Sequence, residues 1–306
     1  MDYHPSGSDT CSSRLEEEFV LTISVSLILS STLSVIGNIF TLITMFRSPI
    51  FLSATNFFLA SIALCDFFSG IFLGPLWVVQ LHNRDLLDKR DALIVAFQFL
   101  TLQIMLVNTY TLCALTYERF LALTRFIYYD KIMNKKRTTA IVLSIWILST
   151  ILASSRYIIL WIKNSLGFLV GEAVFIIFVP LLAFSLFTKR FSSASKTSQI
   201  VPKDVEDNPA MKARAVKEMK NVRYVAIIVS IFLISWTPFF VLCGVDAILN
   251  SIKPCAAIEI RFKLKTLAMF LTIVKSAVNP CIYFWKMSNF RLLPKHSCFL
   301  RRVNCV

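Results

Sequence analysis

The sequence predicts an all-α membrane protein, a bundle of seven membrane-spanning helices followed by a short cytoplasmic surface helix. The 306 residues have a mean hydropathy of +0.68 and only 16% charged residues, which is more apolar surface than one soluble core can bury. About 20 apolar residues cross roughly 30 Å of hydrocarbon as a helix, the form in which backbone groups stay hydrogen-bonded in lipid. Seven runs meet this length: 19–46, 53–81, 91–123, 138–162, 168–190, 221–249 and 264–286.

Basic residues are unevenly divided between the two ends of these runs. Of the 32 Lys and Arg residues, 20 lie on the side of the carboxyl terminus and ten on the other side. The positive-inside rule then places the amino terminus outside the cell and the tail in the cytoplasm. We expect an extracellular segment (1–18) that is too acidic for a signal peptide, a bundle (19–286) in the plasma membrane, and a cytoplasmic tail (287–306).

The composition gives little support to other classes of function. The net charge of +14 follows from the topology and does not indicate nucleic-acid binding. The eight cysteines form no CxxC pair, and the three histidines lie far apart, so we expect no metal site. The chain also has no Gly-rich phosphate loop and no nucleophile with a candidate base, so we expect no cofactor and no enzyme activity.

Every predicted span carries a polar, aromatic or proline marker in a fixed order. These are Asn38, Asp66, Glu118 with Arg119, Trp146, Pro180, Trp236 with Pro238, and Asn279 with Pro280 and Tyr283. Together they resemble the rhodopsin-like family of G-protein-coupled receptors over nearly the whole chain. The resemblance implies a receptor whose extracellular ligand opens the sixth helix and exposes Arg119 to a heterotrimeric G protein, with arrestin as a further partner.

The resemblance also implies a switch around Arg119. Glu218 stands 20 residues before Pro238, about five and a half helical turns toward the cytoplasm, where the family places an acid that holds the arginine. The alternative is that Glu218 belongs to a solvated face of "KARAVKEMK". Pro238 should kink the sixth helix and give it a pivot. Phe232 and Trp236 would relay ligand binding to that pivot, or would only fill the core.

Lys275 lies in the middle of the seventh span, where a charge is costly without a partner. The resemblance implies that Asp66 and Asn279 correspond to two sodium ligands of the family. The family has an asparagine where this chain has Lys275, and a serine where it has Asn108. We hypothesise that the Lys275 ammonium replaces sodium and pairs with Asp66. The alternative is a neutral amine bonded to Asn108 and Asn279.

The expected ligand cavity is apolar and aromatic, as small-molecule pockets tend to be. Amine receptors carry an aspartate where this chain has Thr101, so an amine ligand of the usual kind is not expected. The expected wall residues are Thr101, Met105, Trp236, Phe239, Phe240 and Met269. Glu172 would bind a cationic group, pair with Arg156 or lie in water. The ligand itself, whether small molecule, lipid or peptide, is left open.

Several segments depart from the commonest family pattern. The loop "IKNSLGF" between the fourth and fifth spans is short and lacks a cysteine, which resembles the melanocortin and lipid-receptor branch. Cys255 would pair with Cys243 or Cys11, or remain a thiol. Cys298 and Cys305, beside basic residues, are candidates for acylation that would bind the tail to membrane lipid.

Two other classes remain as alternatives. Opsins bind retinal through a helix-seven lysine, but the corresponding position here is Ile273, and two residues rotate a helical side chain by ~200°. A channel or transporter would use Asp66 and Lys275 as a relay, yet it would need no "ERF" at the end of a helix.

Overall fold

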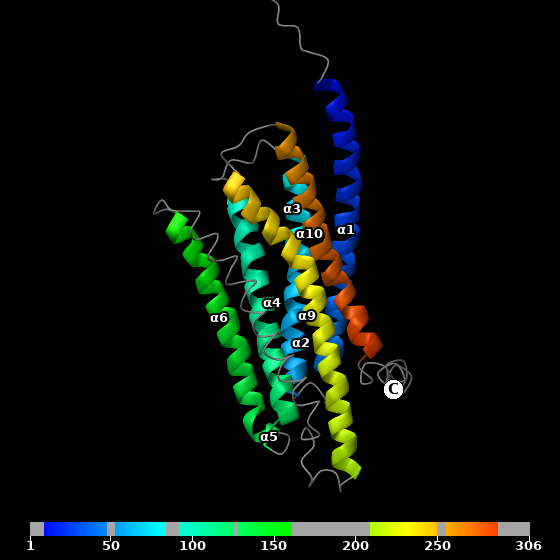
Figure 1. Ribbon diagram of the computed structural model, residues 1–306, viewed down its shortest axis with the longest axis vertical. Coiled ribbons are helices and arrows are strands. Elements are labelled where there is room, and N and C mark those ends of the chain that lie inside the picture. Colours follow the sequence, from blue (N-terminus) through cyan, green and yellow to red (C-terminus); the bar gives the residue numbers. More distant parts are fainter. Residues whose placement is uncertain are drawn as a thin grey trace, which may run out of the picture.

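The computed structural model describes residues 9–47, 53–83, 92–124, 128–160, 209–249 and 255–286. Over these ranges the chain is helical, and long helices run side by side as a bundle (Figure 1). Six of the described helical segments are long and apolar enough to cross a membrane. The expected fifth span, 168–190, lies outside the described residues. The predicted fold class, an all-α membrane bundle, is confirmed.

The helices of the first, sixth and seventh runs begin well before the apolar residues that predicted them. They are α1 (Asp9–Arg47), α2 (Ala54–Phe68), the π-helical turn η2 (Ser69–Leu73), α3 (Gly74–His82), α4 (Ala92–Thr124), α5 (Tyr129–Ile132), α6 (Lys135–Leu160), α9 (Pro209–Leu249) and α10 (Cys255–Lys286). Hydropathy marks only the part of a helix that lies in lipid. The first residues of α9, "PAMKARAVKEMK", are polar but rich in strong helix formers, and proline is favoured in the first helical turn.

The bundle has a central group of helices and two outer ones. Helix α4 packs against α2, α6 and α9, whereas α10 packs against α1 and α9. Helices α1 and α6 lie on opposite outer sides (Figure 1). Large apolar side chains on these two helices, such as Leu29 and Ile147, are exposed, as expected of surfaces that face lipid.

The second span contains a π-helical turn, η2. Ser53 caps its beginning by accepting a hydrogen bond from the Asn56 amide. Farther along, the Gly74 amide donates to the Ser69 carbonyl, five residues back. Pro75 has no amide proton and its ring crowds the preceding turn, so a widened turn just before it accommodates the proline.

This turn lies so close to α1 that only glycine fits at position 70. A Cβ atom on Gly70 would lie 2.8 Å from the Ser31 carbonyl oxygen and 2.9 Å from a methyl carbon of Val35. The Gly70→Ala variant should therefore be destabilised by about 1–3 kcal/mol, because a backbone carbonyl cannot move aside freely. Thermal unfolding of the purified protein would measure this. Gly244→Ala is the matched control, since a Cβ there meets nothing within 4 Å.

Candidate functional site

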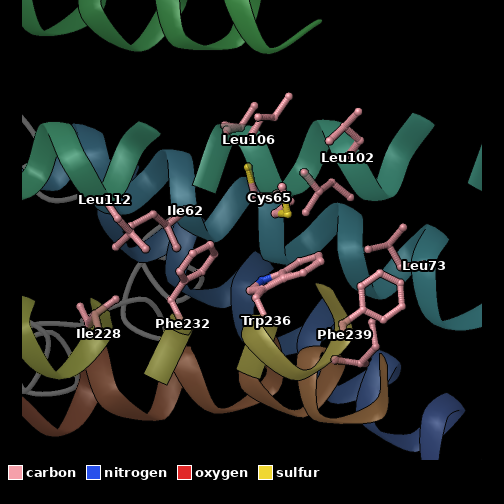
Figure 2. Packing of buried hydrophobic residues seen from close by; sticks show 14 of the residues in the cluster. Ile62, Cys65, Leu73, Leu102, Leu106, Leu112, Ile228, Phe232, Trp236 and Phe239 are labelled. Carbon is pink, nitrogen blue, oxygen red and sulfur yellow. The ribbon is translucent and has the colours of Figure 1, made fainter. Parts of the chain in front are cut away.

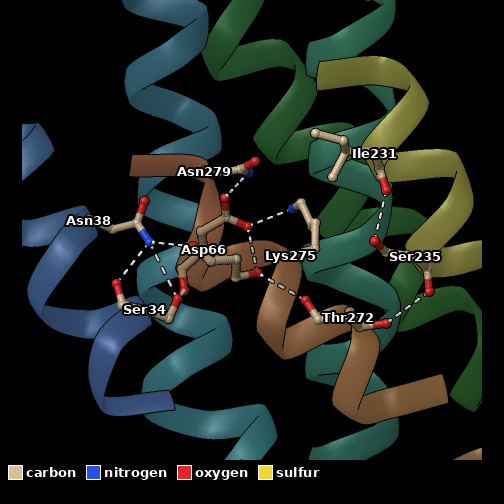
Figure 3. A network of polar contacts seen from close by, with 9 residues as sticks. Ser34, Asn38, Asp66, Ile231, Ser235, Thr272, Lys275 and Asn279 are labelled. Atoms are coloured by element: carbon tan, nitrogen blue, oxygen red, sulfur yellow. Dashed lines mark hydrogen bonds and ion pairs between the residues drawn. The ribbon is translucent and has the colours of Figure 1, made fainter. Parts of the chain in front are cut away.

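Asp66 lies at the centre of the bundle, fully buried on α2. Three side chains of α10 donate to its carboxylate (Figure 3). Lys275 Nζ lies 2.7 Å from Oδ1, the Ser276 hydroxyl lies 2.8 Å from the same oxygen, and Asn279 Nδ2 lies 2.6 Å from Oδ2. Both carboxylate oxygens are therefore bound, and α2 is tied to α10.

Lys275 is buried beside the acidic side chain of Asp66. Its side chain is 3% exposed, and its ammonium also lies 5.7 Å from the centroid of the Phe232 ring on α9, a cation–π distance. The structure thus brings Lys275 and Asp66 together. The arrangement of the alternative, an amine bonded to Asn108 and Asn279, is not found. Both amide atoms of Asn108 lack a hydrogen-bond partner among the described residues, and Asn279 donates to Asp66.

The Asp66 cluster extends to α1 and α9. On α1, the Ser34 hydroxyl donates to the Asp66 carbonyl at 2.9 Å, and Asn38 Nδ2 donates to the Ser276 carbonyl at 3.1 Å. On the other side, the Thr272 hydroxyl donates to the Ser235 carbonyl of α9 at 3.3 Å. We call Ser34, Asn38, Asp66, Lys275, Ser276 and Asn279 the polar core. It joins three helices, α1, α2 and α10, through groups that lipid could not satisfy.

A second buried cluster lies at the carboxyl-terminal end of α4, which the positive-inside rule assigns to the cytoplasm. Arg119 is 3% exposed and binds the fully buried Glu118, with Nε 2.6 Å from Oε2 and a second contact from the other guanidinium nitrogen. The Thr55 hydroxyl of α2 lies 3.2 Å from Glu118 Oε1 and also contacts Arg119. The Tyr129 hydroxyl of α5 donates to the same carboxylate. We call Thr55, Glu118, Arg119 and Tyr129 the cytoplasmic clasp.

Thr55 and Tyr129 were not predicted from the sequence. Both are common polar residues without a spacing that links them to Glu118, and only the packing of α2 and α5 against α4 brings them there. Ser34 and Ser276 of the polar core were not predicted for the same reason, although Ser276 follows Lys275 directly. The Tyr224 hydroxyl of α9, which donates to the Ile282 carbonyl of α10 at 3.1 Å, was also missed.

Aromatic side chains of α9 fill the upper interior of the bundle. Phe232, Trp236 and Phe239 project from α9 toward leucines of α4 (Figure 2). The Trp236 ring lies 6.3 Å from Phe232, 6.2 Å from Phe239 and 5.6 Å from Phe240, measured between centroids. Phe239 in turn lies 6.3 Å from Trp77 of α3. The rings of Phe232 and Trp236, which were expected to relay ligand binding, therefore contact each other, and Phe239 continues these contacts to Trp77.

The other expected wall residues are buried near these rings or on the facing helices. Met105 and Met269 are fully buried. Thr101 is buried as well, and its hydroxyl donates to the Phe97 carbonyl of its own helix at 2.7 Å, so this proton is already used. The Trp236 indole nitrogen has no hydrogen-bond partner among the described residues.

The remaining expectations stay predictions. Pro238 and Pro280 lie inside α9 and α10, and Tyr283 is fully buried with no hydrogen-bond partner for its hydroxyl among the described residues. The following lie outside the described part of the chain, at least in their side chains: Cys11, Arg156, Glu172, Pro180, Glu218, Cys255, Cys298 and Cys305. The Arg119–Glu218 lock, the Glu172 anchor, the Cys255 pairing and acylation of the tail thus remain untested.

Comparison with known proteins identifies the family of this chain. The family described as 7 transmembrane receptor (rhodopsin family) matches residues 37–283. The D(4) dopamine receptor of Mustela putorius furo is 23% identical, covering 78% of this chain and 79% of the relative. Trace amine-associated receptor 5 of Mus musculus is 25% identical, covering 85% and 79%. Melanocortin receptor 4 of Danio rerio is 22% identical, covering 91% and 84%.

Amine and melanocortin receptors match at similar identity, so the similarity does not favour either branch. The family match covers most of the chain and includes the cytoplasmic clasp and all of the polar core except Ser34, and the described helices have the predicted order. The chain belongs to the rhodopsin family of seven-transmembrane receptors.

Proposed function

We propose that this multi-pass signalling receptor binds an extracellular ligand at the aromatic residues of α9 and passes the signal to a heterotrimeric G protein at Arg119. The amino terminus lies outside the cell and the receptor resides in the plasma membrane. The observation that carries the proposal is the burial of Arg119. At 3% exposure, and held by Glu118, it is out of reach of a protein partner. We assign this conformation to the resting state.

Activation then requires a movement that uncovers Arg119. The aromatic contacts connect Trp236 to Phe232, and Phe232 faces the Lys275 ammonium. A ligand that displaces Trp236 changes the packing of α9 on α10, and Pro238, two residues after Trp236, provides a pivot. The ligand shifts an existing equilibrium toward the state in which α9 has swung outward. Arrestin and membrane lipid are further expected partners.

The retinal alternative has less support from the geometry. Ile273, at the position of the opsin lysine, is fully buried and apolar. Lys275 is engaged by Asp66 at 2.7 Å, so its amine is not available as a free nucleophile. A channel or transporter needs no buried Arg–Glu pair at the end of a helix, so the cytoplasmic clasp does not favour that class.

The test is ligand-free nucleotide exchange on purified G proteins by membranes that contain equal amounts of receptor. The wild type should stimulate at least one G-protein class above receptor-free membranes, because a minor active state is populated without ligand. Arg119→Ala should abolish this stimulation. Lys136→Ala, which removes an exposed cation on the same side, should not. A wild type that stimulates no class, or an Arg119→Ala variant as active as the wild type, would contradict the proposal.

A further inference from the structure

Asp66 is an acidic side chain with no exposed surface. Among the described side chains, Asp66 and Glu118 are the buried acids, and Glu118 is bound to Arg119. A buried carboxylate has to be neutralised by a proton, a metal ion or a basic side chain, because an isolated charge in this environment is too costly. Which of the three neutralises Asp66 determines whether the receptor responds to salt.

The residues around Asp66 do not fit an exchangeable sodium ion. The family resemblance implies such an ion at Asp66 and Asn279, yet the Lys275 ammonium lies 2.7 Å from Oδ1 and Asn279 donates its amide protons to Oδ2. A second cation would leave the interior with an uncompensated positive charge. The described residues offer no further acid here, since Glu118, the other buried acid among them, is bound to Arg119.

The ammonium differs from a metal ion because it cannot leave. It is attached to α10 and faces Asp66 on α2 and the Phe232 ring on α9, 5.7 Å from its centroid. Its local concentration does not depend on the external solution. It therefore holds three helices at a constant charge, whereas a bound ion would do so only above its dissociation constant.

We infer that Lys275 is a built-in counter-ion of Asp66 that makes this receptor independent of sodium. The lysine also excludes sodium from oxygen ligands that are otherwise present. With a neutral residue at position 275, the Asp66 carboxylate, the Ser276 hydroxyl and the unpartnered Asn279 Oδ1 would be available to a hard monovalent cation. A single substitution should therefore create a sodium site.

The experiment measures thermal unfolding of purified receptor in sodium chloride and in N-methylglucamine chloride at equal ionic strength. The wild-type midpoint should be the same in both salts. The Lys275→Asn midpoint should be higher in sodium, by about 3 °C when sodium is tenfold above its dissociation constant. Because this readout needs no G protein, failure of the inference is distinguishable from failure of the proposed coupling.

Two controls separate a site from a general salt effect. Lys263→Asn removes a lysine of the same helix that lies over the Phe19 ring, and it should show no difference between the salts. Asp66→Asn combined with Lys275→Asn should lose the sodium response of the single variant. A sodium-dependent midpoint in the wild type would overturn the inference, and so would a Lys275→Asn protein that is folded but indifferent to sodium. Should Lys275→Asn not fold, Lys275→Ser serves as the second variant, with the same two outcomes.

Discussion

Asp66→Asn should lower the stability of the folded receptor by about 3–5 kcal/mol, the usual cost of removing one partner of a buried ion pair. The Lys275 side chain is 3% exposed, so its ammonium would keep its charge without a counter-ion or give up its proton. Either outcome costs free energy. For a protein of this size the thermal midpoint should fall by about 10 °C. Unfolding of the purified protein, followed by an environment-sensitive dye or by loss of solubility, would measure it.

The double variant identifies the ion pair as the cause. Asp66→Asn combined with Lys275→Met removes both charges, and its midpoint should lie well above that of Asp66→Asn alone, because no charge is left uncompensated. Ser276→Ala, which removes one hydrogen bond to the same oxygen, should cost only about 1 kcal/mol. A single variant that is as stable as the double variant would show that the pair does not contribute to folding.

The helices were predictable from local rules, and the contact of Asp66 with Lys275 from a local rule together with the family resemblance. Hydrophobic runs identify membrane spans directly, since lipid requires an uninterrupted apolar helix. Lys275 and Asn279 are four residues apart and so share a helix face, which directs both toward the bundle interior. The family resemblance implies that Asp66 and Asn279 share one site, and this identified Asp66 as the acid opposite Lys275. The need to neutralise buried charges then predicted that the Lys275 ammonium pairs with Asp66.

The cytoplasmic clasp was predictable only in part, because it depends on packing between distant segments. Glu118 and Arg119 are adjacent in the sequence and stood out as a pair. Nothing in the sequence shows that the turn after α4 returns Tyr129 to Glu118, or that α2 begins one residue before Thr55. The π-helical turn was missed for a related reason. Pro75 signals a disturbed helix, but the close contact with α1 determines how the helix is disturbed.

Glu118→Gln should raise ligand-free G-protein nucleotide exchange about tenfold. Glutamine keeps the shape of the side chain but loses the charge that binds Arg119 through two nitrogens. A charge-assisted hydrogen bond is worth about 1.5–3 kcal/mol, and 1.4 kcal/mol changes a ratio of two states tenfold. Because the contact holds Arg119 buried in the state that we assign as resting, its loss favours the active state. Nucleotide exchange at equal receptor density would measure the change.

The other members of the clasp turn this prediction into a graded series. Tyr129→Phe and Thr55→Val each remove one hydroxyl from Glu118, so each should raise exchange less than Glu118→Gln does. Tyr128→Phe is the matched control, because Tyr128 is the neighbouring tyrosine and is 57% exposed. It should behave like the wild type. If Tyr129→Phe and Tyr128→Phe were equally active, α5 would have no part in holding Glu118. The resting state would then depend on contacts of Arg119 other than those through Tyr129.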